Sequence, residues 1–326
     1  MLKRICLALL VLFVSFTLCA QSVDEVTSAD GNTAVNVAAL KGPTAMGLVR
    51  LMDRAESSAV NGNDYSFTIV GSPTEITPLL VRGEVDIAAL PANLASVIYN
   101  NTDGDVEVLA INTLGVLYIV ENGEGIHSLE DLAGKTIYAS GKGSTPEFSL
   151  DYILTQAGLK DSVSVEWMSE HSECVAALVN DDNSAALLPQ PFVTTAMMQN
   201  PDIRVAIDLN DAWDEVSPES SLITGVIVAR KDFIEEHGDA VDAFLADYKE
   251  STEFTSTNLE EAAALVGKYD IVPEAVALKA LPECNIVCIT GDEMKNDLSL
   301  YLEVLYNANP ASVGGALPGE DFYYQF

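Results

Sequence analysis

The chain has few basic residues for its length. Its 326 residues include 16 Lys and Arg against 49 Asp and Glu, which gives a formal net charge of −33. So few cations cannot offset the phosphate charge of a nucleic acid or dock broadly on anionic lipid. We therefore exclude nucleic acid as a partner and expect a solvated acidic surface.

Histidine and cysteine are also scarce, at three and five residues. The best candidate metal ligands are His171, Glu173 and Cys174, but no further ligand follows at a diagnostic spacing. An ordinary strand-to-helix turn explains this group better than a metal site. The chain also has no Gly-x-Ser-x-Gly nucleophile motif. We therefore expect no metal, no other cofactor and no catalysis.

Long hydrophobic runs are confined to the N-terminus. Residues 1–20 are typical of a signal peptide, with a basic start and an apolar stretch too short to span a membrane comfortably. Two interpretations of its cleavage stay open. One is cleavage after Ala20, and the other is lipidation of Cys19, which ends a loose lipobox. Either way we expect an exported protein, periplasmic or lipid-anchored outside the cytoplasm, with residues 21–33 as a polar tether.

Three cysteines remain after export: Cys174, Cys284 and Cys288. Cys284 and Cys288 flank a short Asn-Ile-Val segment, and a disulfide is compatible with an oxidising compartment. A pair of buried free thiols is an equally good interpretation. Both alternatives stay open from the sequence.

Strand and helix patterns alternate along most of the chain, which predicts an α/β protein with mostly parallel sheets. The expected strands are residues 35–40, 65–70, 86–90, 106–113, 116–121, 136–140, 164–168, 185–188, 204–208 and 224–229. After the last of these strands the pattern predicts only helices.

This order predicts two α/β lobes joined by two crossings. The first lobe takes residues 34–113 and 223–326, and the second lobe takes residues 114–222. Each crossing has a Gly beside a strand, as a hinge tolerates. The predicted hinge residues are Leu114, Gly115 and Gly225.

Short turns of small residues and Pro follow several predicted strands. They are Lys41-Gly-Pro-Thr-Ala-Met-Gly47, Gly71-Ser-Pro-Thr74, Leu90-Pro-Ala-Asn93, Gly141-Lys-Gly-Ser-Thr-Pro146 and Leu188-Pro-Gln-Pro-Phe192. One such turn is usually plain punctuation between elements. Several at the carboxyl ends of strands indicate a ligand cleft, because open α/β sheets bind ligands there through backbone amides at helix N-termini.

The same segments carry a family resemblance. Together with Gly83-Glu-Val-Asp-Ile-Ala-Ala-Leu-Pro-Ala-Asn93 and Asp131-Leu-Ala-Gly-Lys-Thr-Ile-Tyr-Ala-Ser-Gly141, they resemble the SsuA/THI5-like (NMT1-like) solute-binding proteins of ABC importers. The resemblance covers essentially the whole mature chain. It implies the type II periplasmic-binding fold, in which two α/β lobes close around one small molecule at two hinge crossings.

The resemblance further implies a monomer that captures a small-molecule ligand and delivers it to an ABC permease. The ligand class it suggests is a thiamine-precursor pyrimidine, a sulfonate or a nitrate-like oxyanion. By matching positions it places the ligand against Gly42, Pro43, Thr44, Ser72, Pro73, Thr74, Pro91, Asn93, Thr113, Gly143, Ser144, Thr145, Glu170, His171, Gln190 and Thr224.

Two other functions stay open. Some THI5-like relatives are pyrimidine-synthesis enzymes, but they carry a tight cysteine cluster that this exported chain lacks. A ligand sensor for a membrane receptor would have the same sequence features as an importer component.

Overall fold

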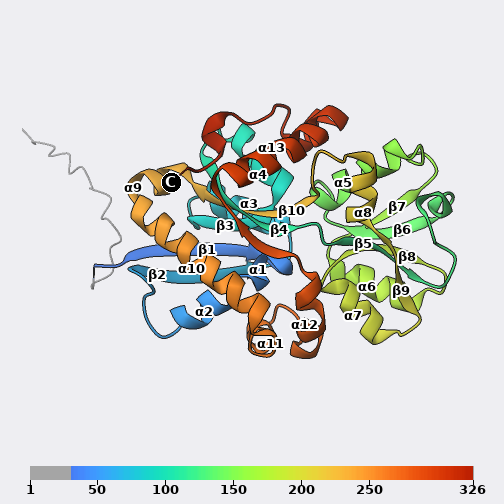
Figure 1. Cartoon of the computed structure of the whole chain (residues 1–326), viewed down its shortest axis with the longest axis horizontal. Coiled ribbons are helices and arrows are strands. Elements are labelled where there is room, and N and C mark those ends of the chain that lie inside the picture. Colours follow the sequence, from blue (N-terminus) through green and yellow to red (C-terminus); the bar gives the residue numbers. More distant parts are fainter. Residues whose placement is uncertain (1–30, 326) are drawn as a thin grey trace, which may run out of the picture.

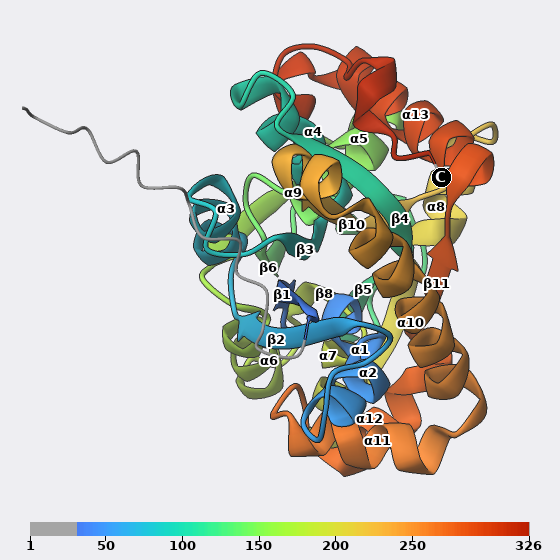
Figure 2. The same cartoon turned by 90° about the vertical axis from the view of Figure 1, so that its left-hand side faces the viewer.

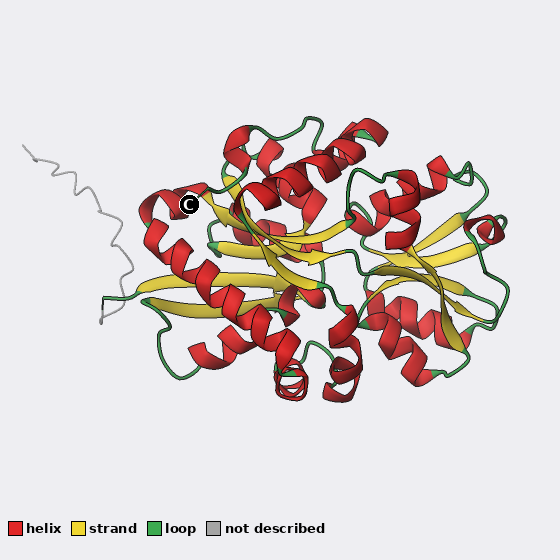
Figure 3. Cartoon of the chain, in the orientation of Figure 1, coloured by secondary structure: helices red, strands yellow, loops and turns green. Residues whose placement is uncertain are grey.

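The computed structural model describes residues 31–325, which form two α/β lobes, each built on one mixed sheet (Figures 1 and 3). The predicted signal peptide, Cys19 and most of the predicted tether lie outside these residues. The predicted fold class, a two-lobe α/β protein, is confirmed.

The first sheet has the strand order β11–β4–β10–β3–β1–β2. Its strands are β1 (Thr33–Leu40), β2 (Asn63–Val70), β3 (Ile87–Pro91), β4 (Val106–Leu114), β10 (Ile223–Arg230) and β11 (Ile286–Ile289). Its central strands are buried on both faces, as long apolar runs such as that of β3 require.

The second sheet has the order β7–β6–β8–β5–β9. Its strands are β5 (Leu117–Asn122), β6 (Thr136–Ser140), β7 (Ser164–Met168), β8 (Ala185–Pro189) and β9 (Ile203–Asp208). The chain passes between the sheets twice, from β4 to β5 and again before β10, so β10 returns to the first sheet as predicted.

The prediction of mostly parallel sheets is wrong. In the first sheet β1 pairs in parallel with β2 and β3, but β10 is antiparallel to both β3 and β4, and β11 is antiparallel to β4. In the second sheet β5 is antiparallel to β8 and β9. The strands that follow a crossing enter their sheet without a βαβ connection, which is the unit that makes neighbouring strands parallel.

Helices cover both faces of each sheet (Figures 2 and 3). On the first sheet, one face carries α3 (Pro73–Val81), α4 (Ala92–Asn101) and α13 (Gly291–Ala308). The opposite face carries α1 (Pro43–Met46), α2 (Val49–Ala55), α10 (Gly238–Thr257), α11 (Leu259–Lys268) and α12 (Glu274–Ala280). Alternation along β1 explains the division, since Val35, Val37 and Ala39 pack on the second of these faces and Ala38 on the first.

The second sheet is covered in the same way. Its helices are α5 (Thr145–Gln156) and α8 (Leu209–Val216) on one face and α6 (His171–Asn180) and α7 (Phe192–Gln199) on the other. The remaining elements are α9 (Lys231–Glu236) and the 3₁₀ turns η1 (Leu129–Leu132), η2 (Leu281–Glu283), η3 (Pro310–Val313) and η4 (Glu320–Phe322).

Aromatic packing joins the lobes beside the cleft. Trp213 of α8 is fully buried, and its ring lies 5.0 Å from that of Tyr152 on α5 and 5.4 Å from that of Tyr301 on α13. Tyr301 also forms a hydrogen bond with Ser149 of α5, 3.3 Å between hydroxyl oxygens. The two lobes are therefore in direct contact across this side of the molecule.

One strand and two helices differ from the sequence prediction. The tail after β10 was predicted to be helical throughout, but Ile286–Ile289 forms strand β11 at the edge of the first sheet. Helices α8 and α9 were not predicted at all. Within residues 31–325, no helix combines the length and apolar character that a membrane span needs.

Candidate ligand-binding site

A cavity lies between the lobes, at the carboxyl ends of strands from both sheets. The space between its walls is about 710 Å³, counting the part that opens to solvent, and we call it the first chamber. Ten of the predicted ligand-binding residues line it: Pro43, Thr44, Pro73, Pro91, Thr113, Ser144, Thr145, Glu170, His171 and Thr224.

The other six predicted residues are not in the lining of the first chamber. They are Gly42, Ser72, Thr74, Asn93, Gly143 and Gln190. Their polar groups form hydrogen bonds with other groups of the protein instead. Ser72 caps α3 by accepting a hydrogen bond from the Thr74 amide, and Gly143 donates its amide to the Glu147 carboxylate at 2.6 Å.

The side chains of Asn93 and Gln190 also form hydrogen bonds within the protein. Asn93 is fully buried and donates its amide to the Ser312 carbonyl at 2.9 Å, while its oxygen accepts from Thr145 at 3.3 Å. The Gln190 carbonyl oxygen accepts hydrogen bonds from Thr194 in the first turn of α7. Asn93 thus ties the two lobes together beside the chamber.

Other lining residues were not predicted from the sequence. They are Leu40, Lys41, Gly71, Val116, Leu117, Ser140, Gly141, Pro146, Ser169 and Pro189. Lys41, Gly71, Gly141, Pro146 and Pro189 belong to the predicted turns themselves, and Leu40 and Ser140 directly precede two of those turns. Val116 and Leu117 come from the first crossing, which carries no turn motif.

The N-termini of α5 and α6 meet the first chamber without side-chain caps. Ser144, the N-cap residue of α5, turns its hydroxyl to the Gly141 carbonyl, and no side chain bonds the first-turn amides of either helix. In α5, Pro146 has no N–H, and the Glu147 and Phe148 amides donate to the Ser144 carbonyl at 3.0 and 3.3 Å. The start of α5 therefore offers an anion the Thr145 amide and the partial positive charge of the helix end. Such an end is able to hold an anionic group.

Thr224 of the first lobe lines the same chamber. Its oxygen is buried and forms no hydrogen bond with any group in residues 31–325. The position follows from an irregularity in β10: Ile223 is opposite Leu114 and Gly225 is opposite Thr113, so Thr224 between them lies in a register shift. A bulge of this kind redirects a side chain out of the ladder. A buried hydroxyl without a partner is costly unless a ligand bonds to it.

His171 is neutral in this environment. Burial lowers the pKa of His171 to about 4, so the imidazole carries no charge near neutral pH. Its Nδ1 lies 2.6 Å from the Ser140 hydroxyl, and its ring lies 5.0 Å from that of Phe192. His171 therefore contributes a polar but uncharged wall.

One carboxylate and one ammonium group reach the chamber at its outer edge. Glu170 of the second lobe approaches Gly71 of the first so closely that a β-carbon on Gly71 would lie 3.2 Å from the carboxylate. The Lys41 ammonium lies 3.9 Å from the exposed Asp270 carboxylate. A ligand in the chamber therefore meets opposite charges at this edge.

The predicted hinge glycines are sites of close packing. A β-carbon on Gly115 would lie 1.4 Å from Asn210 Oδ1, and one on Gly225 would lie 2.5 Å from Asn112 Oδ1. The Gly115 carbonyl also accepts hydrogen bonds from the side chains of Asn210 and Asn285, at 3.3 and 2.6 Å. Whether Leu114, Gly115 and Gly225 act as a hinge stays a prediction.

The sequence left open whether Cys284 and Cys288 form a disulfide or remain free thiols. Cys284 and Cys288 are free thiols in the structure, as is Cys174. Burial raises the pKa of Cys174 and of Cys288 to about 11, which keeps both protonated. Among residues 31–325 no three His, Cys, Asp or Glu side chains come together as a metal site.

Comparison with known proteins decides the family. The family model described as "ABC transporter, phosphonate, periplasmic substrate-binding protein" matches residues 55–271, about two thirds of the chain. The chain belongs to this family. Members are transporter binding proteins that act outside the cytoplasm and are typically not enzymes, and they work with a small ligand and a membrane permease.

Relatives of this binding protein are distant in sequence. A binding protein of Brucella abortus (strain 2308) is 26% identical over 235 residues, which are 68% of this chain and 71% of that protein. An ABC transporter protein from Parabacteroides distasonis has a TM-score of 0.75 and 21% identity, with 90% of this chain and 99% of that chain covered.

A second solved structure is the periplasmic aliphatic sulphonate binding protein SsuA from Escherichia coli. Its TM-score is 0.69 with 19% identity, covering 90% of this chain and 92% of that chain. At these identities the two solved structures show the fold alone. The type II periplasmic binding fold is therefore confirmed for this binding protein, while the narrower SsuA/THI5-like assignment stays a prediction.

Proposed function

We propose that this substrate-binding protein captures a small organic anion of the phosphonate or sulfonate class and delivers it to its permease. The observation that carries the proposal is the pairing of donors across the first chamber. The uncapped start of α5 comes from the second lobe and the unpartnered Thr224 hydroxyl from the first. Tetrahedral oxyanions have several acceptor oxygens, so one group can bond to both lobes at once.

Donation by the backbone suits an acidic protein. Lys41 is the one Lys or Arg in the chamber lining, and it already lies near Asp270. Backbone amides at a helix start attract an anion without adding a side-chain charge. The matched family's description names phosphonate, and the Escherichia coli neighbour is a sulphonate binder, so both classes of oxyanion are reasonable candidates.

The lining of the first chamber favours an oxyanion over a pyrimidine. His171 is the one aromatic side chain in that lining, and hydroxyl groups predominate among the polar ones. Flat heterocycles usually stack on aromatic rings. Closure then follows from contacts that the ligand makes with both lobes, which stabilise the closed state over an open one.

A thermal-shift screen tests this function on the mature protein, residues 21–326. The panel contains alkyl- and arylphosphonates, the matching sulfonates, phosphate, nitrate, thiamine-precursor pyrimidines and amino acids. We expect a concentration-dependent rise in melting temperature with a phosphonate or sulfonate, since a ligand bound only by the folded state stabilises it. A rise with pyrimidines alone would overturn the proposed ligand class.

Transport is tested separately from binding. Deleting the gene should abolish growth on the identified ligand as sole phosphorus or sulfur source. A strain that still grows, but no longer responds to the ligand, would favour the sensor alternative.

A further inference from the structure

A second cavity lies beside the first chamber and shares part of its lining. The space between its walls is about 760 Å³, and we call it the second chamber. Four residues line both cavities: Lys41, Gly71, Glu170 and His171. Two of these come from each lobe, so a ligand that extends from one chamber to the other passes between the facing edges of the lobes.

Apolar side chains from both lobes form part of the second chamber's wall. Val175 of α6 and Phe192 of α7 come from the second lobe, and Ile271 and Val272 come from the first. Val175, Ile271 and Val272 are buried, and Phe192 is half-buried with its ring against His171. The rest of the wall is mostly polar: Lys41, Glu170, His171, Ser172, Thr195, Gln199 and Asp270. The apolar part favours an apolar group, which leaves water more readily than a charged one.

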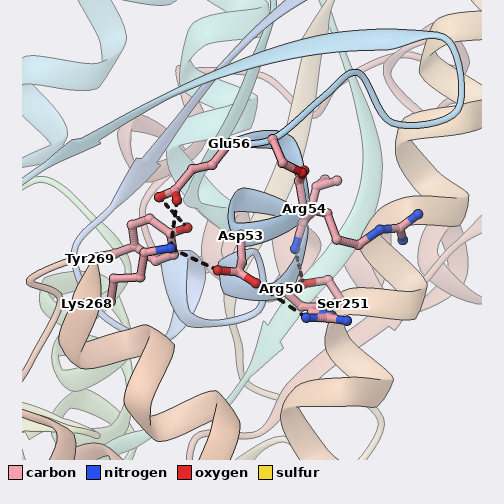
Figure 4. A network of polar contacts seen from close by, with 9 residues as sticks. Arg50, Asp53, Arg54, Glu56, Ser251, Lys268 and Tyr269 are labelled. Carbon is pink, nitrogen blue, oxygen red and sulfur yellow. Dashed lines mark hydrogen bonds and ion pairs between the residues drawn. The ribbon is translucent and has the colours of Figure 1, made fainter.

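The first-lobe wall is held in place by polar contacts with α2. Lys268 bonds to Asp53 at 2.9 Å and to Glu56 at 2.8 Å, and the Tyr269 hydroxyl donates to Glu56 at 2.9 Å (Figure 4). These two residues directly precede Asp270, Ile271 and Val272. Because the segment is anchored where it leaves α11, the wall is already formed before a ligand enters.

We propose that the second chamber binds an uncharged apolar substituent, aryl or branched alkyl, of the same ligand whose anionic group lies in the first chamber. This inference rests on the proposed function. Glu170 and Lys41, of opposite charge, both line the junction. A second charge there meets one attractive and one repulsive group, so the apolar part of the wall favours a neutral substituent. The protein is thus selective for larger organic anions over their methyl analogues.

The test compares benzylphosphonate and methylphosphonate, with benzylsulfonate and methanesulfonate as a parallel pair, by titration calorimetry. For the wild-type protein we expect at least tenfold tighter binding of the benzyl compound within a pair. Thr195→Trp fills the second chamber from α7, where Thr195 is part of the wall. We expect it to reduce the benzyl-to-methyl affinity ratio at least tenfold. Gln199→Trp, one turn further on the same wall, should act in the same direction.

Met197→Trp is the matched control, since Met197 lies on the same helix, is 41% exposed and lines neither chamber. It should leave both affinities unchanged, and melting temperatures check that all variants fold. Equal wild-type affinity for the two members of a pair, or an unchanged ratio in both chamber variants, would overturn the inference while the proposed function stands. A wild-type protein that binds none of the four compounds would overturn both.

Discussion

Thr224 is the residue on which the account of ligand binding depends most. Its hydroxyl oxygen is buried and has no hydrogen-bond partner in residues 31–325. The sequence placed Thr224 at the return crossing, but nothing in its neighbours indicated an unpaired hydroxyl. That property arises from the register shift between β10 and β4, which only the folded sheet shows.

The first prediction concerns Thr224→Val, which keeps the shape and removes the hydroxyl. A hydrogen bond to a charged group contributes about 1.5–3 kcal/mol, so ligand affinity should fall at least tenfold. The melting temperature of the ligand-free variant should stay the same or rise, because an unpaired buried hydroxyl is lost. Thr224→Ser retains the donor and is the control. Calorimetric affinities within twofold for all three proteins would show that Thr224 does not contact the ligand.

His171 gives a second prediction, on stability against pH. Its folded pKa is about 4, below the ordinary value of 6.5, so between these values the unfolded chain binds a proton that the folded protein does not. The contribution of His171 to the free energy of unfolding is largest above the ordinary pKa. It falls as the pH drops toward 4, by at most about 1.4 kcal/mol per pH unit. The free energy of unfolding, wild type minus His171→Gln, should decrease between pH 7 and pH 4.5.

Urea unfolding at each pH measures that difference. His127→Gln replaces an exposed histidine and serves as the control for loss of an imidazole in general. A wild-type-minus-His171→Gln difference that stays constant across the pH range would contradict the lowered pKa of His171.

At the scale of elements, the sequence predicted strands and turns better than their pairing. The apolar runs of β3, β4 and β8 are long and sharply bounded, so their positions were clear. β11 was missed because its four residues lie between helical segments, with no alternation of their own. α8 was missed although its sequence carries helix signals: Asp208 caps it by accepting from the Asn210 amide at 2.8 Å, and Leu209, Ala212 and Trp213 are buried at helical spacing.

The candidate site was likewise predicted only in part from the sequence. The turns that line the first chamber were visible because Gly and Pro mark them locally. The hydrogen bond from Asn93 to Ser312, more than two hundred residues away, could not be predicted from the sequence. Neither could the approach of Glu170 to Gly71, which depends on how the two lobes meet.

The crossing segments give the third prediction. Gly115→Ala should lower the free energy of unfolding by roughly 1–3 kcal/mol, because its β-carbon would overlap the side chain of Asn210. Gly238→Ala is the matched control at the start of α10, where an added β-carbon meets nothing within 4 Å. Denaturant midpoints measure both variants. Equal midpoints for Gly115→Ala and the wild type would show that the crossing has room to adjust.

At the scale of the whole molecule, the dominant property is the net charge of −33. It repels an anionic ligand at long range, while the helix starts in the cleft attract the ligand only at contact. Affinity and encounter rate therefore respond to different parts of the protein.

The fourth prediction follows from that separation. The association rate constant for an anionic ligand should increase with ionic strength between about 10 and 150 mM, as salt shortens the Debye length from about 30 to about 8 Å. Stopped-flow fluorescence measures it, with sucrose at matched viscosity as the control. A rate that decreases with salt would mean that local positive potential at the cleft outweighs the surface charge.

The central claim is that an organic anion binds between the lobes against α5 and Thr224. A crystal structure with the tightest phosphonate or sulfonate from the screen tests it most directly. We expect anion oxygens within hydrogen-bond distance of the Thr145 amide at the start of α5 and of the Thr224 hydroxyl, with both lobes in contact with the ligand. An anion bound outside the first chamber, or a Thr224 hydroxyl still without a partner in the complex, would contradict it.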